Sequence, residues 1–265
     1  MKLNVSMLDV NMVNMMKKKS KRGKILKILI PIFSVILICF ISFFIYAEIY
    51  YHADESVDTA LKSSTLLTVE ENKNDIEFTP VLNTSKSGVI FYPGGKVEEE
   101  AYAPLINKLS KTGVYCVIVR MPFRLAVFGS NRADSIIKNH SEIENWYIAG
   151  HSLGGAMAAS YASKNQDKIE GLILLGAYST KSVKDISVLS IKGSEDKVLN
   201  LDKYEKYHDN LPDDVIEVTL EGGCHSYYGN YGAQKGDGEA TITREKQQNL
   251  TVSYIRGFIL KENWS

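Results

Sequence analysis

A serine lies between two glycines at residues 150–154, Gly150-His151-Ser152-Leu153-Gly154. The apolar run Trp146–Ala149 precedes this segment, and the alanine-rich stretch Leu153–Ser163 follows it. This spacing is typical of a strained turn from strand to helix, which exposes the hydroxyl while the glycines let both backbones approach. The helix start adds unpaired N–H groups and partial positive charge beside a developing oxyanion. We therefore predict Ser152 as a nucleophile; the alternative is a tight turn in which the serine caps the helix.

A serine nucleophile requires a base, and the base requires a group that orients it. The chain has five histidines. Only His225 follows a late predicted strand, Val215–Leu220, in the glycine-bearing loop 221–226. His225 is therefore the predicted base, and the alternative is a surface histidine without a role.

The orienting acid is expected between the serine and the histidine in the chain, after a strand. The predicted strand Val188–Lys192 runs into Gly193-Ser194-Glu195-Asp196. We predict Asp196 as the acid. Glu195 is the main rival because it is adjacent, and Asp202 is a weaker one; a turn-capping aspartate would also explain Asp196.

An oxyanion formed at Ser152 needs two N–H donors. The N–H of Leu153, the residue after the serine, is the first predicted donor. The second is expected in Pro93-Gly94-Gly95-Lys96, which leaves the predicted strand Val89–Tyr92. Gly95 is the predicted donor and Lys96 the alternative.

Two further stretches are candidates for the substrate pocket. Met121–Phe128 is apolar apart from Arg124 and follows a strand end, so we predict Met121 and Phe123 as substrate-binding residues. A core-packing connection explains the stretch equally well. Tyr227 begins the stretch 227–243 directly after the predicted base, so it is expected to rim the cleft. Whether this stretch moves as a lid stays open.

Short apolar runs alternate with longer amphipathic stretches from Gly88 onward, which predicts βαβ units around a mostly parallel sheet flanked by helices. The predicted strands are almost wholly apolar, as burial on both faces requires. The remaining predicted strand segments are Val114–Val119 and Leu172–Leu175, and the remaining predicted helices are Glu98–Lys111, Arg132–Asn139, Asp202–Asn210 and Glu245–Leu260.

An uncharged run, Ile28–Ala47, follows a cluster of basic residues near the start of the chain. A helix of this length spans roughly 30 Å, the thickness of a bilayer core. We predict an uncleaved anchor with its N-terminus in the cytoplasm and the rest of the chain outside the cell membrane. The alternative, a cleaved secretory signal, usually has a shorter apolar run and a small-residue cleavage site. The basic residues are Lys17, Lys18, Lys19, Lys21, Arg22, Lys24 and Lys27.

The composition sets further limits on function. The formal net charge is zero, which gives no reason to expect a nucleic-acid partner. The three cysteines have no spacing typical of a metal site or a disulfide framework. We therefore expect no metal, no cofactor and a monomer. The predicted organisation is a basic segment (1–24), a transmembrane anchor (25–47), a stalk leading into a first strand (48–74) and a catalytic domain (75–265).

These motifs together resemble the α/β-hydrolase superfamily from about Gly88 to Leu260, and in detail a bacterial group within it that is often membrane-anchored or exported. The resemblance rests on the serine, acid and histidine segments already quoted and on Tyr92–Glu98, Arg120–Phe123 and Gly229–Gln248. It implies the α/β-hydrolase fold, the order serine, acid, histidine, and hydrolysis of an ester-like bond. Many relatives carry His-Gly where this chain has Pro93-Gly94, a change that a backbone donor tolerates.

The expected activity is that of a membrane-tethered serine hydrolase acting on a small-molecule or lipid-like acyl substrate. Two other classes stay open on sequence alone. An acyltransferase would pass the acyl group to an envelope component instead of water. A tethered binding protein on an inactive hydrolase fold is expected to lack a member of the triad, and none is missing here. Among hydrolases, an esterase is preferred to a peptidase, thioesterase or amidase by analogy alone.

Overall fold

The computed structural model describes residues 4–82 and 84–261, without the side chains of residues 4–8 and 19–26. The chain divides into two units, Met1–Ile49 and Tyr50–Ser265. Residues 1–3 of the predicted basic segment and residues 262–265 of the predicted catalytic domain lie outside the described residues.

The first unit contains one long helix, α1 (Asn4–Glu48). Its part Lys27–Glu48 has a mean hydropathy of 3.0 and is a candidate membrane span by length and composition. Pro31 lies inside this helix, which begins upstream of the apolar run. The predicted apolar helix is therefore present and continues into the basic segment.

The second unit is built on an eight-stranded sheet in the order β1-β2-β4-β3-β5-β6-β7-β8. Strand β2 pairs antiparallel with β1 on one side and with β4 on the other. The remaining neighbours in this order, from β4 through β3 to β8, pair parallel. The strands are β1 (Leu67–Glu71), β2 (Asp75–Pro80), β3 (Ser87–Tyr92), β4 (Tyr115–Val119), β5 (Asn145–His151), β6 (Gly171–Leu175), β7 (Ser187–Gly193) and β8 (Ile216–Leu220).

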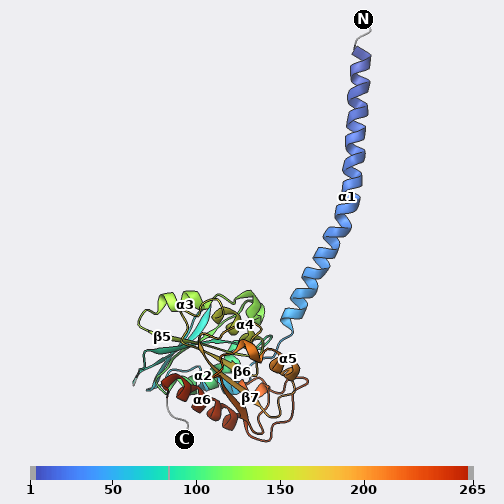
Figure 1. Cartoon of the computed structure of the whole chain (residues 1–265). Coiled ribbons are helices and arrows are strands. Elements are labelled where there is room, and N and C mark those ends of the chain that lie inside the picture. Colours follow the sequence, from blue (N-terminus) through green and yellow to red (C-terminus); the bar gives the residue numbers. More distant parts are fainter. Residues whose placement is uncertain (1–3, 83, 262–265) are drawn as a thin grey trace. The chain divides into compact units, whose positions relative to one another are not determined.

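Helices cover both faces of the sheet (Figure 1). Helices α2 (Ala103–Ser110) and α6 (Arg244–Leu260) pack on one face, where Leu105 and Phe258 join one buried cluster. Helices α3 (Ala133–Asn139) and α4 (Leu153–Ala162) pack on the other, around Ile136 and Ala158. The remaining helices are α5 (Leu201–Lys206) and the 3-10 helices Glu55–Thr59, Glu99–Tyr102, Pro122–Arg124, Ala126–Phe128, His208–Asn210 and Ser226–Tyr228.

Two predicted helices are divided in the structure. The stretch 98–111 forms a 3-10 turn followed by α2, because Pro104 lies at the start of α2, where its missing N–H is tolerated. The stretch 202–210 forms α5 and a separate 3-10 turn. The second compact unit begins at Tyr50, and Val57 is buried in it.

The parallel register decides where chemistry can occur. The carboxyl ends of β3, β5, β7 and β8 lie at one edge of the sheet because these strands run in the same direction. The loops that follow them carry Gly95, Ser152, Asp196 and His225, respectively. Ligands of open α/β sheets bind at this edge.

Candidate active site

Ser152 lies on the turn between β5 and α4 with φ 52° and ψ −122°. A positive φ is strained for a residue with a side chain, and such strain is concentrated at functional sites. The flanking glycines permit the turn: a Cβ on Gly150 would come within 2.5 Å of the Gly154 backbone, and one on Gly154 would clash with the carbonyl oxygen of Tyr92. The backbone of Ser152 is fixed by its N–H, which donates to Leu175 O at 3.0 Å.

Asp196 and His225 form a buried pair. Oδ2 of Asp196 lies 2.7 Å from Nδ1 of His225, and each side chain is 1% exposed. The other carboxylate oxygen, Oδ1, accepts the N–H groups of Val198 at 2.9 Å and Leu199 at 2.8 Å. The carboxylate is therefore fixed in the orientation that makes Nδ1 of His225 the protonated ring nitrogen.

The two rival acids lie elsewhere. Glu195 accepts the hydroxyl of the neighbouring Ser194 at 3.0 Å. Asp202 is exposed in the first turn of α5. Neither is joined to His225 by a hydrogen bond among the described residues, so the structure brings Asp196 alone of the three to the histidine.

Two side chains that the sequence did not indicate hold the segment around His225. Asp237 accepts the N–H of His225 at 3.1 Å and that of Ser226 at 2.8 Å. Burial opposes ionisation of Asp237, but these backbone N–H groups outweigh it and hold the pKa of Asp237 below its usual value. Gln247, on α6, accepts the N–H of Cys224 and donates to its carbonyl oxygen. No local pattern marks these residues, because each acts through a partner distant in the chain.

Nε2 of His225 is buried and has no hydrogen-bond partner in the described part of the chain. It is the ring nitrogen that would accept a proton from a nucleophile. A hydrogen bond from Ser152 to this atom is not formed in this conformation, which is common before a substrate is bound. The residue before Ser152, His151, lies 4.4 Å from His225 between ring centroids. Gly176, which follows Leu175, packs against Asp196 and His225.

His151 is a second buried histidine at the site, and sequence reasoning assigned it no role. Tyr102, 49 residues away in the chain, places its hydroxyl 2.8 Å from Nδ1 of His151. The same hydroxyl accepts the N–H of Gly94 at 3.0 Å, so its own proton is directed to Nδ1. Burial, with a smaller contribution from His225, lowers the pKa of His151 well below its ordinary value. His151 is therefore neutral, with its proton on Nε2.

The predicted oxyanion donors lie next to one another. A Cβ on Gly95 would come within 2.7 Å of the Leu153 side chain, so the loop after β3 reaches the start of α4. The N–H of Leu153 is among the first N–H groups of this helix, which have no partner within the helix. The N–H of Lys96, the alternative donor, is already donated to Arg124 O at 2.8 Å. This contact favours Gly95 over Lys96.

The three predicted substrate-binding residues lie in different surroundings. Met121 is buried and its sulfur packs against Gly129, as in a core connection. Phe123 is 40% exposed, with φ 55°, in the loop whose Arg124 accepts the Lys96 N–H. Tyr227 lies 5.1 Å from the guanidinium carbon of Arg244 and lines a cavity of about 780 Å³. Phe123 thus lies next to Arg124, which binds the loop after β3, whereas Tyr227 borders a cavity lined by residues that follow β8.

The described residues contain no group of three or more His, Cys, Asp and Glu side chains that could hold a metal ion. Cys116 and Cys224 are buried free thiols, and Cys39 is exposed on α1.

Comparison with known proteins gives a consistent picture. The Alpha/beta hydrolase family matches residues 88–249. The structure is similar to mouse alpha/beta hydrolase domain-containing protein 10, with a TM-score of 0.54 and 14% identity over 76% of this chain and 100% of that chain. It is similar to Est1E from Butyrivibrio proteoclasticus, with a TM-score of 0.51 and 15% identity over 74% of this chain and 98% of that chain. Among curated proteins, no sequence matches this chain.

A third similar structure comes from a study of two metagenome-derived lipolytic enzymes, with a TM-score of 0.53 and 13% identity over 74% of this chain and 100% of that chain. Identities this low show the fold alone. Together with the family match they confirm the predicted fold, a mostly parallel sheet flanked by helices, with one apolar N-terminal helix that is a candidate span.

Proposed function

The chain belongs to the Alpha/beta hydrolase family, and from this premise we propose that it is a serine hydrolase that cleaves a carboxylic ester or a related acyl bond. The observation that carries the proposal is the buried Asp196–His225 hydrogen bond of 2.7 Å, at the sheet edge that also presents Ser152. A carboxylate, an imidazole and a serine hydroxyl in this order can carry out acyl transfer without a cofactor.

In the proposed reaction, Oγ of Ser152 attacks the carbonyl carbon while Nε2 of His225 takes the hydroxyl proton. Asp196 orients the imidazole and stabilises its positive charge. The N–H groups of Gly95 and Leu153 stabilise the oxyanion. His225 then gives its proton to the leaving alkoxide, and an acyl-enzyme remains. Water, deprotonated by His225, attacks this ester, releases the acid and restores Ser152.

We also propose that residues 27–48 anchor the protein in the membrane, with the N-terminus in the cytoplasm and the hydrolase unit outside. The apolar composition of Lys27–Glu48 supports a span. The basic cluster before it supports the orientation, because positive residues stay on the cytoplasmic side. The substrate would then be an acyl compound of the envelope or of the surroundings.

One labelling experiment tests both parts of the proposal. Intact cells producing the full chain are treated with a charged fluorophosphonate that does not cross the membrane. We expect the wild-type protein to be labelled and Ser152→Ala to lose labelling completely. Ser160→Ala, a control in helix α4 directly after Ser152, should be labelled like the wild type. Labelling of Ser152→Ala would exclude this serine as nucleophile. Labelling of the wild type only after lysis would exclude the outside location.

A further inference from the structure

The residues that follow the candidate span make contact with both loops of the proposed site. We call residues 50–56 the juxtamembrane segment, residues 93–98 the oxyanion loop and residues 221–237 the histidine loop. We propose that the juxtamembrane segment positions these two loops relative to each other, so that Tyr51 acts as a positioning residue for catalysis. The proposal rests on the function proposed above, and it changes the expected stalk into a part of the active site.

The segment pairs with the oxyanion loop through the backbone. The N–H of Tyr51 donates to Lys96 O at 2.8 Å, and the N–H of Glu98 donates to Tyr51 O at 2.9 Å. These bonds form a parallel bridge between Tyr51 and Val97. The carboxylate of Glu98 accepts the N–H of Ala53 at 2.8 Å. Residues 51–53 therefore hold the second half of the oxyanion loop, residues 96–98.

Tyr50 contacts Arg124, a residue whose backbone binds the oxyanion loop. The guanidinium carbon of Arg124 lies 3.4 Å from the centroid of the Tyr50 ring, within cation–π range. Arg124 O accepts the N–H of Lys96 at 2.8 Å. Lys96 and Arg124 both have positive φ, at 60° and 55°. Strained residues of this kind persist when their surroundings determine them fully, and Tyr50 belongs to those surroundings.

The same segment contacts the histidine loop. The hydroxyl of Tyr51 accepts the N–H of Lys235 at 3.0 Å, and its ring lies 5.6 Å from that of Tyr231. The N–H of Asp54 donates to Asn230 O at 2.8 Å. In the sequence, all three of these partners lie between His225 and Asp237. The carboxylate of Asp237 accepts the backbone N–H of His225. Tyr51 thus touches the oxyanion loop with its backbone and the histidine loop with its side chain.

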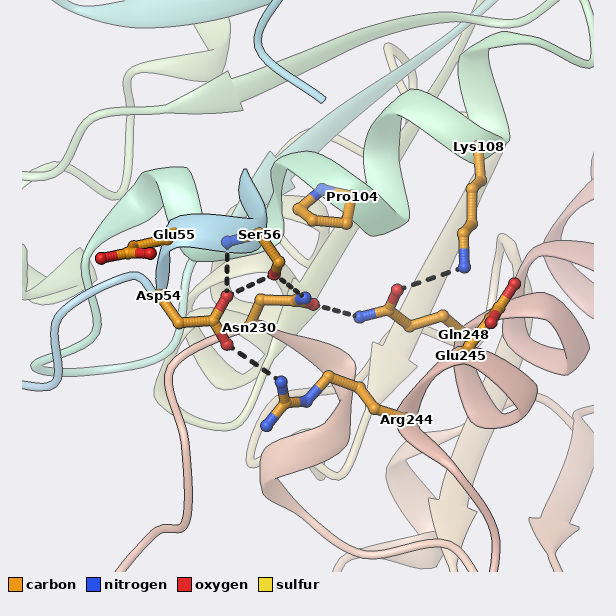
Figure 2. Close-up of a pocket in the computed structure, with 9 residues that line it drawn as sticks. All are labelled: Asp54, Glu55, Ser56, Pro104, Lys108, Asn230, Arg244, Glu245 and Gln248. Carbon is orange, nitrogen blue, oxygen red and sulfur yellow. Dashed lines mark hydrogen bonds and ion pairs between the residues drawn. The ribbon is translucent and has the colours of Figure 1, made fainter. Parts of the chain in front are cut away.

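Hydrogen bonds and one ion pair fix the far end of the segment (Figure 2). The amide of Asn230 donates to Ser56 Oγ at 2.7 Å, and Arg244 forms an ion pair with Asp54 at 3.0 Å. Gln248 donates to the side-chain oxygen of Asn230 at 2.7 Å. These groups line a cavity of about 730 Å³ between the segment, α2 and α6. Two of these side chains, Arg244 and Gln248, belong to α6, so the end of the segment cannot shift relative to this helix without breaking the network.

The functional consequence follows from how catalysis depends on geometry. The oxyanion donor and the base come from different loops, and a displacement of 1 Å between reacting groups can cost about 100-fold in rate. The backbone of Tyr51 bonds to the oxyanion loop, whereas its side chain reaches the histidine loop. Removing this side chain should loosen the histidine loop without changing the nucleophile or the acid.

The test compares Tyr51→Ala, Tyr51→Phe and Glu55→Ala in the full chain in detergent micelles. Glu55 is an exposed residue of the same segment and serves as the control. We expect Tyr51→Ala to lower kcat for p-nitrophenyl acetate about tenfold with KM within about twofold. Tyr51→Phe keeps the ring and should recover part of this loss, and Glu55→Ala should match the wild type. Amide hydrogen exchange in peptides covering residues 225–237 should increase in Tyr51→Ala and not in Glu55→Ala.

A lowered Tm of Tyr51→Ala with wild-type kcat for the folded protein would overturn the proposal, because it would indicate a purely structural role. Unchanged exchange in the histidine loop would overturn it as well. If the wild type hydrolyses no ester and reacts with no fluorophosphonate, the proposed function fails, while the exchange measurement still decides whether Tyr51 holds the loop.

Discussion

Two histidines meet at the site, one from the end of β5 and one from the loop after β8, and they differ in the group that faces Nδ1. His151 and His225 are each 1% exposed, and their ring centroids are 4.4 Å apart. Nδ1 of His225 faces the Asp196 carboxylate, whereas Nδ1 of His151 faces the hydroxyl of Tyr102. The two rings are therefore held in opposite tautomers, with a free lone pair at Nε2 of His225 and a proton at Nε2 of His151.

The difference shows how partners, rather than burial, select the base. A carboxylate stabilises the imidazolium that forms when a histidine takes a proton. A tyrosine hydroxyl that donates to Nδ1 stabilises the neutral ring and blocks protonation at that nitrogen. His225 can thus accept a proton from Ser152, while His151 can only donate a hydrogen bond. His151 also joins the nucleophile turn to the oxyanion loop, because Tyr102 holds Gly94 as well.

The largest effect is expected from exchanging the partner of His225. In Asp196→Asn the side-chain oxygen remains bound to the N–H groups of Val198 and Leu199, so the amide NH₂ group must face His225. It would donate to Nδ1 and force the proton to Nε2, the tautomer of His151. We expect kcat to fall by about 10³- to 10⁴-fold with KM little changed. Steady-state kinetics with p-nitrophenyl acetate measures this.

Glu195→Gln is the matched control for Asp196→Asn, because it removes the neighbouring charge by the same chemical change. Glu195 bonds to Ser194 and not to the histidine, so its activity should stay within about twofold of the wild type. A loss in Glu195→Gln equal to that in Asp196→Asn would mean that the acid has been assigned to the wrong residue.

A smaller effect is expected from removing the partner of His151. Tyr102→Phe leaves the N–H of Gly94 without an acceptor and Nδ1 of His151 without a donor. We expect kcat to fall roughly tenfold, because the oxyanion loop loses its position, and stability to fall by about 1–3 kcal/mol. Kinetics and denaturant unfolding of the same preparation give both values.

Tyr92→Phe is the control for Tyr102→Phe. The Tyr92 hydroxyl is also shared, since it donates to Ser130 O and accepts the N–H of Ala133. These partners belong to the α3 side of the sheet, so the variant should lose comparable stability and keep its kcat. Equal losses of kcat in both variants would show that stability alone explains the effect.

The sequence predicted most of the fold, and it placed the three proposed catalytic residues at one edge of the sheet, for specific reasons. Ser152, Asp196 and His225 each follow a predicted strand, and the parallel strands of such a sheet bring their carboxyl ends to one edge. Tyr102 and Asp237 could not be predicted because their partners lie 49 and 12 residues away and no periodic pattern links them.

The juxtamembrane segment escaped prediction for a different reason. Its contacts to the oxyanion loop run mainly through backbone atoms, which any residue type can supply, so its polar sequence resembles a stalk. Adjacent tyrosines directly after an apolar span, such as Tyr50 and Tyr51, are also typical of a membrane interface, so they do not by themselves indicate contact with a folded domain.

The smallest effect is expected in the pH dependence of stability. The pKa of His151 is lowered in the folded protein, whereas an unfolded histidine titrates near about 6.5. Below that pH the unfolded chain binds a proton that the folded chain does not, so His151 makes the free energy of unfolding fall by up to about 1.4 kcal/mol per pH unit. In His151→Asn, which keeps an acceptor for Tyr102, this contribution should disappear. The free energy of unfolding in urea, measured between pH 7 and pH 5, should therefore change less with pH in the variant. Parallel profiles would contradict this prediction, because they would show that His151 also takes up a proton in the folded protein.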